Sequence, residues 1–164
     1  MSEIIIQGGR RLEGTVRVQG AKNSVLPVLA ATILHPGQTV LRGCPHLSDV
    51  EASIRILRHL GCSAQWEGEE LVVDTSSMDR WDVPDHLMRE MRSSVIFLGA
   101  ILARLGWAEM SYPGGCELGP RPIDLHLAAI RALGGTITEE PGGMLCQGAL
   151  HGADIVLSLP SVGA

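Results

Sequence analysis

The chain has 164 residues, of which 45% are hydrophobic and 19% charged, a balance typical of a globular domain rather than a disordered segment. Its formal net charge is −5 and it contains no basic run, which argues against a nucleic-acid partner. Residues Met1–Gly9 lack the pattern of a secretory signal, and no apolar stretch reaches the length of about 20 residues that a bilayer requires. We therefore expect a cytoplasmic protein without a membrane partner.

The predicted elements form two similar series in chain order. Periodicity and turn residues predict a helix, a strand, a second helix and a hairpin in each series. The first series is Val25–Leu34, Thr39–Arg42, Asp49–Leu60, and Ser63–Glu67 with Leu71–Asp74. The second series is Val95–Leu105, Ala108–Tyr112, Ile123–Leu133, and Thr136–Glu139 with Met144–Gln147. Successive landmarks recur 70 to 73 positions apart, which indicates an internal repeat.

The repeat leads to three further expectations. The first helix of each series is apolar nearly all round, so we expect both to be covered on all sides, with the sheets outside them. Strands are predicted at Glu3–Gln7, Gly14–Val18 and Ala153–Leu157 as lead-ins to units. A third unit would begin its helix at Ser161–Ala164, and the chain is therefore interpreted as truncated.

The four cysteines do not have the spacing of a zinc or redox motif, and no metal site or cofactor is expected. Cys44, Cys62 and Cys146 lie in or beside apolar strands and helix ends, so each is interpreted as a buried structural thiol. Cys116 differs because two glycines precede it and Pro120-Arg121-Pro122 follows it. A thiol beside an arginine and the start of a helix is expected to have a lowered pKa and to be reactive.

Three cations are candidates for binding an anionic small molecule. Lys22 and Arg92 stand at equivalent positions of the repeat, just before its apolar helices, and Arg121 lies between two prolines in the cysteine loop. Lysine and arginine placed in this way suit phosphate and carboxylate groups. His126 follows on the next helix and is interpreted as a structural histidine rather than a general base.

The motifs of the chain closely resemble those of the UDP-N-acetylglucosamine enolpyruvyl transferase (1-carboxyvinyltransferase) family. They are Gly20-Ala21-Lys22-Asn23, Met91-Arg92-Ser93-Ser94, Pro113-Gly114-Gly115-Cys116, Gly119 through His126, and Ser161-Val162-Gly163-Ala164. The resemblance implies transfer of the enolpyruvyl group of phosphoenolpyruvate to the 3-hydroxyl of UDP-N-acetylglucosamine, with release of phosphate. That reaction is the first committed step of peptidoglycan synthesis, on which the cell wall, cell shape and cell division depend.

The resemblance also implies a role for each site residue. Cys116 would be the general acid, would carry a covalent phosphoenolpyruvate adduct and would be alkylated by fosfomycin. Phosphoenolpyruvate would be bound by Lys22, Asn23 and Arg121. The residues implied for UDP-N-acetylglucosamine are Arg92, Arg121, Pro122, Ile123, Asp124, Leu125, Ser161, Val162 and Gly163. Leu159 departs from the lysine that some members carry near this segment.

The implied fold is α/β with mixed sheets, an inside-out α/β barrel of βαβαββ repeats, here truncated. Residues 1–21 would form strands of a second domain. Residues 22–164 would form an incomplete first domain of two units and the start of a third, and the missing C-terminal part of the same chain would be its partner. Two alternatives remain: a 5-enolpyruvylshikimate-3-phosphate synthase-like enzyme, or a non-catalytic nucleotide-binding fragment. The isolated chain is expected to be inactive.

Overall fold

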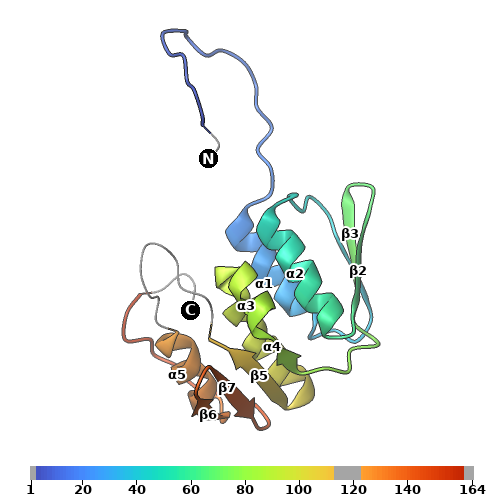
Figure 1. The fold of residues 1–164 in the computed structure, drawn as a ribbon, viewed down its shortest axis with the longest axis vertical. Coiled ribbons are helices and arrows are strands. Elements are labelled where there is room, and N and C mark those ends of the chain that lie inside the picture. The colour runs from blue at the N-terminus through green and yellow to red at the C-terminus, as the bar shows by residue number, and fades with distance from the viewer. Residues whose placement is uncertain (1–2, 113–122, 161–164) are drawn as a thin grey trace.

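The computed structural model describes residues 3–112 and 123–160, in which helices pack against two separate β-sheets (Figure 1). The elements of the first unit are α1 (Lys22–Thr32), β1 (Gln38–Leu41), α2 (Ser48–His59), β2 (Ser63–Glu67) and β3 (Glu70–Asp74). Its strands form an antiparallel sheet in the order β1-β3-β2, in which Val40 lies opposite Val72. The central strand β3 is the most buried of the three.

The second unit repeats this topology with one strand, one α-helix and one 3-10 helix more. Its elements are β4 (Asp82–Val83), α3 (Asp85–Glu90), the 3-10 helix η1 (Arg92–Val95), α4 (Ile96–Leu105), β5 (Trp107–Ser111), α5 (Asp124–Ala132), β6 (Thr136–Glu140) and β7 (Gly143–Gln147). The sheet order is β4-β5-β7-β6, and β4 runs parallel to β5. The series β5-β7-β6 reproduces β1-β3-β2, so the internal repeat is confirmed. With β4 in front, the second unit has the complete βαβαββ order.

The helices follow from ordinary sequence signals. Helix α2 has acidic residues in its first turn and basic residues in its last, which suits the helix dipole. It ends before Gly61, whose φ of 89° is a left-handed conformation that terminates helices. Strand β5 alternates buried and exposed residues, with Ala108 and Met110 facing the core.

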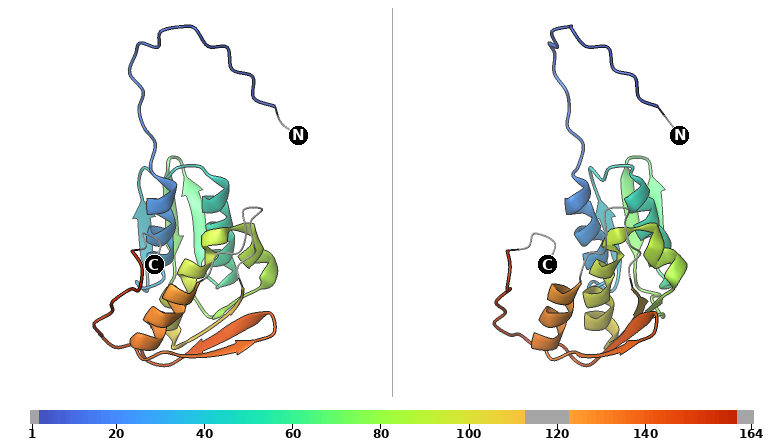
Figure 2. Two further views of the ribbon diagram at one scale, coloured as in Figure 1. Left: turned by 90° about the vertical axis from the view of Figure 1, so that its left-hand side faces the viewer. Right: turned by 60° about the vertical axis from the view of Figure 1, so that its left-hand side comes forward.

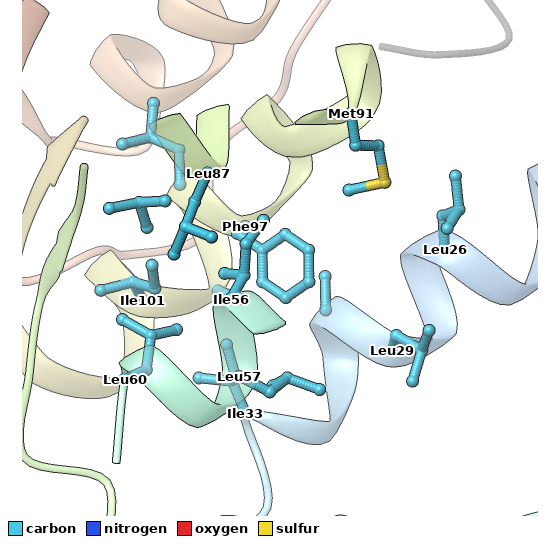
Figure 3. Packing of buried hydrophobic residues seen from close by; sticks show 14 of the residues in the cluster. Leu26, Leu29, Ile33, Ile56, Leu57, Leu60, Leu87, Met91, Phe97 and Ile101 are labelled. Carbon is cyan, nitrogen blue, oxygen red and sulfur yellow. The ribbon is translucent and has the colours of Figure 1, made fainter. Parts of the chain in front are cut away.

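The core lies between the helices and the sheets. Helix α1 packs against both α2 and α4, while α2 lies against β2 and α4 against β5. Phe97, Leu57 and Ile33 are fully buried where α4, α2 and α1 meet (Figure 3). Helices inside and sheets outside is the α/β arrangement that the resemblance implied, and it is confirmed here for two units.

The predicted lead-in segments, residues 3–20 and Ala153–Leu157, form no strand with any partner among the described residues. Residues 3–20 contain no β-strand and are exposed throughout, as Figure 2 shows for the extended segment that precedes α1. Ile4 and Val16 are 85% exposed, and Val156 is 94% exposed. A segment of β-forming residues yields a strand only when another strand supplies its hydrogen-bond partners. In the described part of the chain, no strand pairs with these segments.

The expectation that the two apolar helices are covered on all sides is also wrong. Val28 of α1 is 45% exposed, and Leu34, just after the end of this helix, is 54% exposed. A hollow of about 230 Å³ lies between α1 and α4, and its lining includes Pro27, Leu34 and Ala103. Helix α2 packs on another side of α1 and strand β5 on another side of α4, while a strip of apolar surface stays open between α1 and α4.

Candidate functional site

Lys22 and Asn23 begin helix α1, and both are exposed. The approach to this helix is closely fitted, because a β-carbon at Gly20 would lie 2.4 Å from the carbonyl oxygen of Gly43. The side chain of Lys22 turns toward α2, where its Nζ lies 2.9 Å from Oδ2 of Asp49. The first turn of α1 therefore presents an exposed ammonium that is already paired with one carboxylate.

Arg92 is half-buried and begins η1, which leads directly into α4. The preceding residue, Met91, is buried, and its Sδ lies 3.5 Å from Oγ of Ser53 on α2. Glu90 forms an ion pair with Arg55, nearly two turns of α2 from Asp49. Helix α2 thus contacts the segments that carry Lys22 and Arg92, and the two helices that follow these cations pack against each other.

The flanks of the cysteine loop are joined by one acidic residue. The hydroxyl of Tyr112, after β5, donates to Oε2 of Glu139 at 3.0 Å, and this bond raises the pKa of Tyr112. The other carboxylate oxygen of Glu139 accepts a hydrogen bond from Arg131 of α5 at 3.1 Å. Glu139 of β6 therefore contacts both flanks of the cysteine loop: Tyr112 on the side of β5 and Arg131 on α5.

The residues after the loop begin helix α5. Ile123 occupies the N-cap position, Asp124 lies exposed in the first turn and Leu125 is half-buried. His126 is half-buried, and burial lowers its pKa, an effect that the charge of Asp124 partly offsets. This environment is consistent with the structural role expected for the histidine.

Several predicted site residues lie outside the described residues. They are Cys116, Arg121, Pro122, Ser161, Val162 and Gly163. Their expected roles therefore remain predictions.

The other three cysteines are buried, as expected from the sequence. Burial and the nearby Glu51 raise the pKa of Cys44, whose thiol lies 4.0 Å from the carbonyl oxygen of Pro45. Burial raises the pKa of both Cys62 and Cys146 to about 11. Thiols in such surroundings are poor nucleophiles at neutral pH. Among residues 3–112 and 123–160, no group of three or more histidine, cysteine or acidic residues has the geometry to hold a metal ion.

No helix within the described ranges has the length and apolar character needed to cross a membrane. Sequence reasoning missed the contact of Asp49 with Lys22 and the contacts of Glu139 with Tyr112 and Arg131. Asp49 has the signature of an ordinary first-turn acid, and its partner Lys22 is distant in sequence. Only the fold brings the two together.

Comparison with known proteins assigns the class. The sequence profile of the EPSP synthase (3-phosphoshikimate 1-carboxyvinyltransferase) family matches residues 6–164, and the chain belongs to this family. Among solved structures, it resembles the enolpyruvyl transferase NikO from Streptomyces tendae, with a TM-score of 0.72 and 27% identity over 85% of this chain and 31% of that one. An EPSP synthase from Acinetobacter baumannii shares the fold, with a TM-score of 0.66 and 20% identity over 92% of this chain and 36% of that one.

Within this class, curated relatives are UDP-N-acetylglucosamine 1-carboxyvinyltransferases. The protein of Caldanaerobacter subterraneus subsp. tengcongensis is 50% identical to this chain over its whole length. The protein of Chlorobium chlorochromatii is 44% identical over the same length. That of Acinetobacter guillouiae is 42% identical over 99% of the chain. These matches confirm the resemblance found in the motifs. The chain spans about 40% of the length of these relatives.

Proposed function

We propose that the chain supplies part of an enzyme that transfers the enolpyruvyl group of phosphoenolpyruvate to the 3-hydroxyl of UDP-N-acetylglucosamine and releases phosphate. The observation that carries the proposal is the match along the whole chain to UDP-N-acetylglucosamine 1-carboxyvinyltransferases, at 42–50% identity in the relatives named above. The cationic starts of α1 and η1 agree with two anionic substrates. The reaction belongs to peptidoglycan synthesis in the cytoplasm, and hence to cell wall formation, cell shape and division.

The roles of the site residues follow from the same proposal. Cys116 protonates the methylene carbon of phosphoenolpyruvate and is the thiol that fosfomycin alkylates. Lys22, Asn23 and Arg121 bind phosphoenolpyruvate. UDP-N-acetylglucosamine is bound by Arg92, the segment 121–125 and the segment 161–163. Preorganised cations of this kind stabilise charge as it develops in the transition state.

The domain assignment is part of the proposal. Residues 1–21 contribute strands to a second domain, which agrees with the full exposure of the apolar side chains Ile4, Ile6, Val16 and Val18. Residues 22–164 form two βαβαββ units and the start of a third. Because a closed site requires both domains, the isolated chain does not catalyse the transfer.

A chimera tests the proposal directly. Residues 1–164 replace the matching segment of the 50%-identical Caldanaerobacter relative, and phosphate release from phosphoenolpyruvate is measured with UDP-N-acetylglucosamine or with shikimate 3-phosphate as acceptor. Activity with the nucleotide sugar alone is the expected result. Activity with shikimate 3-phosphate, or a folded chimera inactive with both acceptors, would overturn the proposal.

The role of the thiol is tested in the same chimera. Cys116→Ser is expected to abolish labelling by fosfomycin, whereas Cys44→Ser, at the equivalent position of the first unit, should leave labelling unchanged. Persistent labelling of the Cys116→Ser protein would move the reactive thiol elsewhere.

A further inference from the structure

Lys22 is the only lysine of the chain; the other basic side chains are arginines. Its Nζ lies 2.9 Å from Oδ2 of Asp49, and the two side chains differ in exposure, 53% for Lys22 and 23% for Asp49. The less exposed carboxylate is the fixed partner and the more exposed ammonium is the one that it orients. An ammonium has three donors, so the contact with Asp49 leaves two for other acceptors.

Asp49 itself is held firmly. It lies in the first turn of α2, next to Val50, which is fully buried. Its backbone carbonyl accepts a hydrogen bond of 2.9 Å from Oγ of Ser53, one turn later. A carboxylate in the first turn of a helix is also stabilised by the free backbone N–H groups there. The backbone of Asp49 is therefore fixed, and its short side chain gives the carboxylate less freedom than the long side chain of Lys22 has.

We propose that Asp49 is a positioning residue that orients the ammonium of Lys22 toward an anionic ligand. The inference rests on the proposed function, in which Lys22 binds phosphoenolpyruvate. A free lysine side chain loses considerable rotamer freedom when a ligand immobilises it. A side chain that is already ordered by Asp49 loses less, and the affinity for the ligand is correspondingly higher.

The carboxylate of Asp49 also repels an anion, which opposes this effect. The repulsion acts at an exposed site, where physiological salt screens charges over about 8 Å. The free N–H groups at the start of α2 offset it further. Salt also weakens the ion pair that orders Lys22, but its atoms are in direct contact at 2.9 Å, so it is screened less than the repulsion between Asp49 and a ligand farther away, and the positioning effect is the larger one.

The single lysine makes the test specific. Growth with ¹³C,¹⁵N-lysine labels one side chain, whose ε-methylene signals are followed while the chain is titrated with phosphoenolpyruvate or inorganic phosphate at 0.15 M salt. In the unchanged chain, we expect the two ε-protons to be distinct, as in an ordered side chain, and to shift saturably. In Asp49→Asn, the ε-protons should merge into one averaged signal, and Kd should rise about two- to fivefold, the range expected for an exposed ion pair.

Asp85→Asn is the matched control, because Asp85 also lies in the first turn of a helix and pairs with an arginine, Arg89. It should behave like the unchanged chain, and backbone amide spectra check that each variant is folded. Asp49→Glu keeps the charge, and its Kd and ε-proton separation should lie between those of the unchanged chain and those of Asp49→Asn. If Asp49→Asn does not fold, Asp49→Glu takes its place in the test.

Two outcomes overturn the inference in different ways. If the unchanged chain responds to the anions and Asp49→Asn binds them equally or more tightly, or keeps distinct ε-protons, the positioning role alone is wrong. If the Lys22 signals of the unchanged chain respond to neither anion, the positioning role is wrong, because the first turn of α1 then does not bind an anion, while the proposed function is still tested separately by the chimera.

Discussion

Gly20 lies against the carbonyl oxygen of Gly43 so closely that a β-carbon at position 20 would be 2.4 Å from that oxygen. The same β-carbon would be 3.1 Å from Cδ of Pro45. The contact joins the segment before α1 to the turn after β1. The contact explains on steric grounds why position 20 of the Gly20-Ala21-Lys22-Asn23 motif is a glycine. Lys22 follows two residues later, so the contact lies next to the start of α1.

Gly20→Ala is therefore expected to lower the free energy of unfolding by about 1–3 kcal/mol, the range for overpacking, unless the segment before α1 shifts away. Either response displaces the start of the helix that carries Lys22. Gly8→Ala is the control, because nothing lies within 4 Å of a β-carbon there. Equal stability of the two variants in urea denaturation, with the Lys22 signals unchanged, would contradict the steric account.

Arg104 connects the two units. From the last turn of α4, its Nη1 donates to the carbonyl oxygen of Ile33 at 3.0 Å and its Nη2 to that of Thr75 at 3.4 Å. Arg104→Met should lower the free energy of unfolding by about 1.5–3 kcal/mol, because it removes a charged donor from both carbonyls. Arg89→Met, which removes an exposed pair with Asp85, should change it by less than about 1 kcal/mol. A similar loss in both variants would argue against the inter-unit role of Arg104.

The buried thiols should be nearly inert in the folded chain. With the pKa of Cys62 and Cys146 raised to about 11, roughly one thiolate in a thousand forms at pH 8. Iodoacetamide labelling followed by peptide mass spectrometry should find both modified slowly at pH 8, faster as pH rises, and completely in guanidinium. Rapid modification of either residue in the folded chain at pH 8 would show that the thiol is not buried.

The carboxylate of Asp82 should make stability depend on acid pH. Burial raises its pKa, but hydrogen bonds from Arg80 and His59 outweigh this effect, so the pKa of folded Asp82 is lowered. Its stabilising contribution is then present above the ordinary aspartate value of about 4 and is lost as pH falls through the lower folded value. Because the side chain is 35% exposed, we expect less than about 1 kcal/mol.

The measurement is urea denaturation of the unchanged chain and Asp82→Asn across the acid range. The variant should be the less stable above about pH 4, and the difference should shrink as the medium becomes more acidic. A difference that stays constant into strong acid would mean that Asp82 contributes through packing rather than through its charge.

Local pattern was sufficient for the elements that build each unit. The predicted helix Asp49–Leu60 corresponds to α2 at Ser48–His59, and the predicted hairpin Ser63–Glu67 with Leu71–Asp74 to β2 and β3. These elements have strong periodicity and clear glycine stops, and their partners are close in sequence. In the second unit, the predicted helix Ile123–Leu133 corresponds to α5 at Asp124–Ala132, for the same reason.

Features that depend on distant partners were not accessible in the same way. Glu3–Gln7 has the run of β-branched apolar residues typical of a strand but finds no partner strand in the described residues, whereas the two-residue β4 forms because it lies beside β5. In the candidate site, Lys22 and Arg92 were recognised from their equivalent repeat positions. The carboxylate of Asp49 was missed, because only tertiary packing brings α2 beside the start of α1.

The separation of the strands into two sheets has a consequence for how the chain folds. Every strand of the first sheet lies within residues 38–74, and every strand of the second within residues 82–147. No hydrogen-bonded strand pair among the described residues joins the two sheets, so loop closure in each is short-range. On the ribosome, the first sheet has all of its strands before the second begins to emerge, and the chain can acquire its architecture one unit at a time.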